Sequence, residues 1–342
     1  MRAFITGLAG PELTGAERQF LKDAKPWGLI VFKRNVASPD AVRRLIEDFR
    51  ASVGWQAPVL VDQEGGRVQR LGPPHWPAYP PGEAYGVLYD GDRKAGLAAA
   101  RLGARLVAAD LAALGIDVDC LPIADVPVPG ADQIIGDRAY GTTPDKVAAI
   151  AGEIAAGLLE GGVLPVLKHI PGHGRATADS HDKLPVVSAS RATLEVTDFA
   201  AFRPLAKLPV GMTAHVVFSA IDPVAPATTS VTIVRDVIRD SIGFAGLLMS
   251  DDVSMGALSG SLGERARAAL AAGCDIVLHC NGKMDEMRAV AAETPELAGE
   301  AARRAAAALA LRKPAAPIDV AARRDEFFAL MADAWQPAQR SA

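Results

Sequence analysis

Short apolar runs alternate with longer amphipathic stretches along this chain. The short runs are almost continuously hydrophobic, which is typical of parallel strands that are covered on both faces. The longer stretches repeat apolar residues at helical spacing. The eight apolar runs are AFITGL (3–8), GLIVF (28–32), PVLVD (58–62), VDCLPIADV (118–126), PVLKHI (165–170), VGMTAHVVF (210–218), GLLMSDD (246–252) and CDIVLHC (274–280).

Caps and glycines mark the ends of the predicted helices. Ser38 and Pro39 open the stretch 38–54, where serine can cap and proline suits the first helical position. The stretch 143–162 repeats these signals, with Thr143 as the expected cap and a Gly-Gly pair as the stop. Strands that alternate with helices predict an α/β fold, a (β/α)8 TIM barrel in a single domain. A doubly wound sheet is the alternative, but no G-x-G-x-x-G follows the first strand.

The barrel is expected to occupy residues 1–295, with residues 296–342 forming C-terminal helices packed on it. Two irregular stretches, 65–93 and 168–185, are too long for simple connectors. Each follows the carboxyl end of a predicted strand, which is where barrels of this kind build their active sites.

Composition narrows the possible partners. The 342 residues are half apolar, and their net charge of −4 comes without a basic run or stripe, which argues against a nucleic-acid partner. Cys120, Cys274 and Cys280 lie in or beside apolar runs, as buried thiols of a reducing compartment do. The N-terminus lacks the features of a signal peptide, and charged residues interrupt every Ala-rich helix. We therefore expect a cytoplasmic monomer that binds no membrane.

Charged residues stand at the ends of the predicted strands, where apolar residues would be usual. Alone, each is more often a loop cap or half of a salt bridge; Asp252 is expected to bind loop amides, and His215 is as easily a core histidine. Because the ends of barrel strands share one rim, their repetition predicts a common site. The residues are Asp62, Asp125, Arg138, Lys168, His169, His215, Asp251 and Asp252.

The stretch 168–185, KHIPGHGRATADSHDKLP, allows three interpretations. One is a zinc site, since His169 and His173 are four residues apart, but Pro171 and Gly172 exclude a helix that would present both. Another is a noncatalytic barrel whose polar rim binds a ligand. The third is glycoside hydrolysis, in which a strand-end aspartate acts at the anomeric carbon and a loop histidine, oriented by a nearby carboxylate, moves the proton.

The same stretch resembles the signature of bacterial β-N-acetylglucosaminidases (β-hexosaminidases) of glycoside hydrolase family 3, the peptidoglycan-recycling type. VDQEGGRVQRL, IGDRAYG, TAHVVFS, FAGLLMSDDVSM and AGCDIVLHCN are similar to the family's other blocks and follow in the same order. The resemblance covers roughly residues 5–290, nearly the whole predicted barrel.

This resemblance implies a retaining exo-β-N-acetylglucosaminidase that needs no cofactor and no metal. Asp251 would be the nucleophile, His181 the acid/base and Asp179 its partner, and the small-residue loop 172–180 would move His181 in and out of place. The substrate would be a small molecule, a peptidoglycan fragment that ends in N-acetylglucosamine. The sugar would be held by Asp62, Arg70, Arg138, Lys168 and His169, with Asp125 helping to line the site.

Two neighbouring activities stay open at this point. β-Glucosidases of the broader family usually add a second α/β domain that supplies a glutamate, whereas this chain carries Asp-Ser-His. Phosphate could replace water as the acceptor, because a neutral histidine does not repel it as a carboxylate would. The loop after Asp252 is also shorter than is usual in the family and lacks an acidic residue after Met255, which bears on the preferred leaving group.

Overall fold

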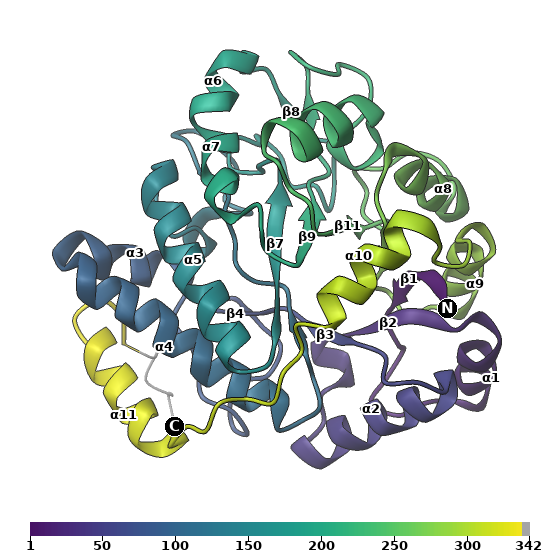
Figure 1. Cartoon of the computed structure of the whole chain (residues 1–342), viewed down its shortest axis with the longest axis horizontal. Helices are drawn as coiled ribbons and strands as arrows, with labels where there is room; N and C mark the ends of the chain where they lie inside the picture. The colour runs from purple at the N-terminus through teal and green to yellow at the C-terminus, as the bar shows by residue number, and fades with distance from the viewer. Residues whose placement is uncertain (337–342) are drawn as a thin grey trace.

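Eight parallel strands close into a barrel that helices surround (Figure 1). This computed structural model describes residues 1–336, so residues 337–342 of the expected C-terminal segment lie outside the described residues. Each predicted apolar run overlaps one barrel strand, which confirms the (β/α)8 fold. Around the barrel the strands are β1 (Arg2–Thr6), β12 (Ile276–His279), β11 (Leu247–Asp252), β9 (Val210–Thr213), β7 (Leu164–Ile170), β6 (Val118–Asp119), β3 (Val59–Val61) and β2 (Pro26–Val31).

The helices begin and end close to their sequence signals. Ser38 caps α2 (Pro39–Val53) by accepting a backbone hydrogen bond, and Gly54 ends that helix with a left-handed φ of 79°. Thr143 stands at the cap of α5 (Pro144–Glu160), but its side chain makes no capping hydrogen bond, contrary to expectation. The other helices between barrel strands include α1 (Gly15–Ala24), α3 (Gly82–Gly91), α4 (Arg93–Ala112) and α8 (Leu262–Ala272), and α9 (Met284–Glu293) follows the last strand.

Two stretches that the sequence predicts as helices, 191–206 and 232–244, take other forms. The stretch after β10 (Val217–Phe218) forms a π-helix, η5 (Ile233–Ser241). The stretch after β8 (Val186–Val187) is divided at Thr197, because Asp198 turns inward and binds Arg175, whose Nε lies 2.6 Å from Asp198 Oδ2. The divided pieces are α6 (Arg191–Val196), α7 (Asp198–Phe202) and a short 3₁₀ turn, η3 (Arg203–Leu205).

Apolar side chains form one layer inside the barrel and another between the strands and the helices. The helix α10 (Gly299–Leu309) closes the end of the barrel where the strands begin, since its Ala305 and Ala308 join the interior layer. Arg304 of this helix binds Asp275 just before β12, with Nη1 2.9 Å from Oδ1. Loops cover the opposite end of the barrel, where the strands finish.

The last described helix, α11 (Val320–Met331), packs beside α4 (Figure 1). Its Phe327 is fully buried against the rings of Tyr79 and Tyr85, with centroids 6.2 and 6.3 Å away. These contacts fasten the segment that follows the barrel to the barrel wall. Over residues 1–336, no helix combines the length and the apolar character needed to cross a membrane.

Two small sheets stand beyond the strand ends and shape the loops there. The antiparallel pair follows β3, and the parallel pair joins the loops after β7 and β9. They consist of β4 (Gln63–Gly65) with β5 (Val68–Gln69), and β8 (Val186–Val187) with β10 (Val217–Phe218).

Candidate active site

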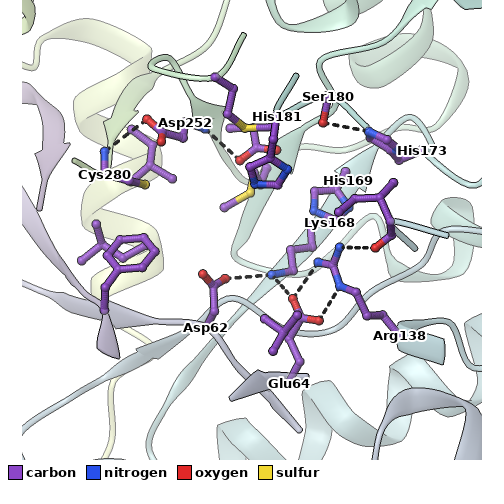
Figure 2. Close-up of a pocket in the computed structure, with 18 of the residues that line it drawn as sticks. Asp62, Glu64, Arg138, Lys168, His169, His173, Ser180, His181, Asp252 and Cys280 are labelled. Atoms are coloured by element: carbon purple, nitrogen blue, oxygen red, sulfur yellow. Dashed lines mark hydrogen bonds and ion pairs between the residues drawn. The ribbon is translucent and has the colours of Figure 1, made fainter. Parts of the chain in front are cut away.

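The strand ends and the loops after them enclose a cavity of about 350 Å³ (Figure 2). Because β3, β7 and β11 finish at the same rim, residues far apart in the sequence meet there. The predicted residues that line the cavity are Asp62, Arg70, Arg138, Lys168, His169, His181, Asp251 and Asp252. Asp179 does not line it and contacts His181 instead.

Five charged side chains, Asp62, Glu64, Arg70, Arg138 and Lys168, form one connected network, the charged floor. Lys168 Nζ lies 3.0 Å from Asp62 Oδ1 and 2.6 Å from Glu64 Oε1. Arg138 donates two hydrogen bonds of 2.8 Å to Glu64, and Arg70 donates one of 2.9 Å to Asp62. Figure 2 shows four of these side chains gathered on one side of the cavity. Three cations therefore face two carboxylates.

Burial makes the charged floor depend on this pairing, since the side chains of Lys168 and Glu64 are 2% and 4% exposed. Burial alone would raise the pKa of Glu64, but Arg138 and Lys168 outweigh it and hold that pKa at about 2. The pKa of Asp62 is also held far below its usual value, against burial, by Lys168 and Arg70. Asp62, Glu64, Arg138 and Lys168 are ionised at neutral pH, so they offer a polar ligand fixed donors and acceptors.

The turn after β3 brings Glu64 and Arg70 to the cavity. Buried Gln63 holds this turn, because its Oε1 accepts the N–H groups of Arg70 and Leu71 at 3.2 and 3.0 Å. Its Nε2 donates to the carbonyl oxygen of Leu71 at 2.8 Å. Asp62 and Glu64 face the same way because alternate residues of an extended chain share a side.

His169 is held from behind by Asp125. Its Nδ1 lies 2.7 Å from Asp125 Oδ2, while Asp125 Oδ1 accepts the N–H of His173 at 2.6 Å. Burial would raise the pKa of Asp125, but the charge and hydrogen bond of His169 lower it. Asp125 does not line the cavity, contrary to expectation, because these contacts engage its carboxylate; it orients His169 instead.

Asp251, the second-last residue of β11, lines the cavity. Its Oδ1 accepts the backbone N–H of Asp252 at 2.8 Å. Burial would raise the pKa of Asp251, but His215 and His169 lead the charges that lower it below its usual value. The result is an ionised carboxylate on a rigid strand, which is the form that a nucleophile requires.

Asp252 turns its carboxylate to the loop, as the sequence indicated. It accepts the N–H and hydroxyl of Ser254 at 3.0 and 2.6 Å and the N–H of Cys280 at 3.1 Å. Fully buried His215 braces the same strand, with Nε2 3.0 Å from the carbonyl oxygen of Asp252 and Nδ1 2.7 Å from Thr228 Oγ1. Both residues thus support Asp251.

Asp179 and His181 form a dyad on an exposed loop. Asp179 Oδ1 lies 2.7 Å from His181 Nδ1 and accepts the backbone N–H of His181 at 2.8 Å. The two side chains are 32% and 62% exposed. Burial acts to raise the pKa of Asp179, but its hydrogen bonds from His181 lower it, so the carboxylate is ionised. With Nδ1 engaged, Nε2 is the nitrogen that can exchange a proton with a ligand.

The loop that leads to the dyad is anchored over its first half. Buried His173 ties it together, with Nε2 3.1 Å from Ser180 Oγ, and burial lowers the pKa of His173 to about 4, so it is neutral. A side chain at Gly174 would come within 2.2 Å of the carbonyl oxygen of Val126. Exposed residues begin at Thr177, although Ser180 is buried again.

The zinc interpretation requires His169 and His173 to bind the same metal ion. Their rings stand edge to face with centroids 5.8 Å apart, but Asp125 engages His169 Nδ1 and Ser180 engages His173 Nε2. Among residues 1–336, no three His, Cys, Asp or Glu side chains converge so that they could hold a metal ion.

Sequence reasoning missed several residues that line the cavity, among them Glu64 and Ser180. Glu64 was quoted only within a motif, although its position two residues after Asp62 was a usable signal. Ser180 gave no signal, because its contact with His173 depends on how the loop folds back. His75 and Trp76, from the long stretch after β3, lie outside the cavity.

Sequence comparisons identify relatives over most of the chain. Residues 6–308 match the Glycosyl hydrolase family 3 N terminal domain. A β-hexosaminidase from Alkalilimnicola ehrlichii is 41% identical over 283 residues, which cover 81% of this chain and 80% of the relative. A β-hexosaminidase from Methylococcus capsulatus is 40% identical over 278 residues, which cover 80% and 81% of the two chains.

The fold is also similar to that of a solved structure. NagZ from Neisseria gonorrhoeae, in complex with N-trifluoroacetyl-D-glucosamine, superposes with a TM-score of 0.83 at 31% sequence identity. The superposition covers 97% of this chain and 96% of that chain. The barrel and the helices after it are therefore shared almost throughout.

Proposed function

Because the chain belongs to glycosyl hydrolase family 3, as a glycoside hydrolase of the β-hexosaminidase type, we propose that it removes terminal N-acetylglucosamine from peptidoglycan fragments. The proposed substrates are the disaccharide of N-acetylglucosamine with 1,6-anhydro-N-acetylmuramic acid and its peptides, released during cell-wall recycling. The names of the relatives and the glucosamine-derived ligand of the solved neighbour support an N-acetylhexosamine as the sugar that is removed.

The first proposed step forms a covalent glycosyl-enzyme. An oxygen of Asp251 bonds to the anomeric carbon while the glycosidic C–O bond breaks. The proton of His181 Nε2 passes to the departing oxygen, and Asp179 stabilises the imidazolium that gives it up.

The second proposed step releases the sugar with retained configuration. A water molecule gives a proton to His181 and attacks the anomeric carbon, and the bond to Asp251 breaks. Two inversions at one carbon restore the original configuration. Because every proposed group belongs to one chain, we propose that a monomer suffices, without a cofactor.

The charged floor is the proposed binding site for the sugar hydroxyls. Its donors and acceptors are ionised and held in place by one another before the ligand arrives. Pre-positioned groups bind a polar ligand without the entropic cost of ordering long side chains. His169, fixed by Asp125, adds one more oriented donor or acceptor.

The observation that carries this proposal is the arrangement within one cavity. An ionised carboxylate on a strand and the histidine of an exposed His–Asp dyad line one cavity together with the charged floor. Acetal cleavage needs these three elements together. Cys120, Cys274 and Cys280 are buried free thiols, which agrees with the proposed cytoplasmic location.

The test is product analysis of a muropeptide mixture incubated with the protein, with and without phosphate, by mass spectrometry. The proposal predicts free N-acetylglucosamine in both samples. A sugar phosphate that forms only with phosphate present would identify phosphate as the acceptor. No released sugar, or faster cleavage of β-glucosides than of N-acetyl-β-glucosaminides, would contradict the proposal.

A further inference from the structure

The loop after the proposed nucleophile touches the loop that carries the proposed acid/base. We name residues 253–260 the latch loop. The N–H of Gly256 donates a 3.0 Å hydrogen bond to the carbonyl oxygen of His181, and the N–H of Ala257 donates one of 3.2 Å to that of Ser180. These two adjacent donors therefore hold the main chain at Ser180 and His181.

Gly256 approaches this backbone so closely that a larger residue does not fit. A Cβ added there would lie 2.7 Å from the carbonyl oxygen of His181 and 2.9 Å from that of Asp182. The φ angle of Gly256 is outside the left-handed range, so its glycine is required for space and not for backbone conformation. At an exposed site with such a φ, alanine would otherwise be tolerated or stabilising.

The latch loop is the firmer of the two loops. Asp252 caps its start through Ser254. Arg265, on α8, donates hydrogen bonds of 2.9 to 3.0 Å to three carbonyl oxygens of this loop, those of Val253, Met255 and Gly260. The segment 181–184 on the other side of the contact is exposed. The braced loop therefore sets the position of the exposed one.

From this contact we infer that Gly256 is a positioning residue for the acid/base, and that the latch loop holds His181 in place relative to Asp251. The inference rests on the proposed function, in which both residues act on the same glycosidic bond. Since the latch loop continues directly from β11, the nucleophile and the support for the acid belong to one rigid unit. Losing the latch should impair proton delivery and spare nucleophilic attack.

The test compares Gly256→Ala with the wild type on two N-acetyl-β-glucosaminides, one with a methyl and one with a dinitrophenyl leaving group. The methyl group needs protonation and the dinitrophenolate does not. We expect kcat/KM for the methyl glycoside to fall about tenfold more than that for the dinitrophenyl glycoside. Ser259→Ala, an exposed change in the same loop, is the matched control and should affect both substrates equally little.

A double variant separates positioning from general damage. Added to His181→Ala, Gly256→Ala should lower activity on the dinitrophenyl glycoside by less than about twofold, because no acid remains to be positioned. Equal losses on both substrates, with or without a lower unfolding temperature, would overturn the inference, as would wild-type activity on both. Normal activity of Asp251→Ala or His181→Ala would instead overturn the proposed function beneath it.

Discussion

The charged floor and the Asp179–His181 dyad are built in opposite ways. Lys168 is almost completely buried and contacts two carboxylates, whereas the His181 side chain is 62% exposed and contacts one. The floor comes from the ends of β3 and β7, the hairpin after β3 and the short 3₁₀ turn η2 (Gly136–Arg138), whereas the dyad lies on the loop after β7. The two parts face each other across the same cavity.

The difference matches two kinds of work. Groups that bind a ligand through fixed charge gain from burial, because a low dielectric strengthens each contact and pairing prevents movement. A group that gives and takes a proton must reach both substrate and water, so exposure suits it. Asp251 resembles the floor in its structure, because it is a partly buried residue at the end of a strand, but its proposed role in the reaction pairs it with the dyad.

Asp251→Ala is expected to have the largest effect, and it tests whether catalysis depends on the carboxylate at the end of β11. We expect kcat on an aryl N-acetyl-β-glucosaminide to fall by at least about 10³-fold, because the covalent step is lost. Binding of N-acetylglucosamine, measured by calorimetry, should remain, since the floor is untouched. Near-normal turnover would contradict the nucleophile assignment.

His181→Ala is expected to come second and to depend on the substrate. Alkyl and sugar leaving groups should lose roughly 10²-fold or more in kcat/KM, because they leave only when protonated, and a good phenolate should lose much less. The measurement is a series of glycosides whose leaving groups differ in pKa. Equal losses across the series would mean that His181 helps to bind the substrate, as the charged floor is proposed to do, and does not donate the proton.

The sequence predicts the buried part better than the exposed part, and the reason is physical. Asp62, Lys168 and Asp251 stand out because charge is rare in apolar strands, and barrel geometry gathers strand ends at one rim. Gly256 could not be assigned in this way, because its role is a close approach between two loops and depends on their folded paths. The resemblance to a known family supplied the roles of Asp179 and His181.

Secondary structure follows the same rule. The cap at Ser38 is confirmed because it depends on neighbours in sequence. The break at Thr197 and the inward turn of Asp198 were missed because they follow from Arg175 on another loop. A contact between segments, which local patterns do not encode, accounts for this miss, whereas the absent capping bond at Thr143 departs from a local signal.

Glu64→Gln tests whether the floor depends on its charges. Removing one carboxylate leaves Lys168 and Arg138 underpaired, so we expect the free energy of unfolding to fall by about 2–4 kcal/mol. Denaturant titration measures this. Asp137→Asn is the matched control, because its salt bridge with Arg67 is about 40% exposed and worth less than about 1 kcal/mol.

The pH dependence of stability follows from the same residue. The pKa of Glu64 is about 2 in the folded protein and lower than in the unfolded chain. Its contribution is therefore complete above the unfolded value near 4.5 and is lost as pH falls toward 2. Glu64→Gln should show a shallower decline over this window than the wild type. Parallel curves would mean that Glu64 is not selectively ionised by folding.

Ser180→Ala should give the smallest effect, because it removes one of several supports of the dyad. The lost hydrogen bond joins Ser180 to a neutral His173, and such a bond contributes about 0.5–1.5 kcal/mol. The backbone bonds from the latch loop remain, so kcat/KM for alkyl glycosides should fall only about 2- to 10-fold. Aryl glycosides with good leaving groups should be nearly unaffected. A loss as large as that of His181→Ala would mean that the hydroxyl itself takes part in proton transfer, and the dyad would then have to be described as a triad.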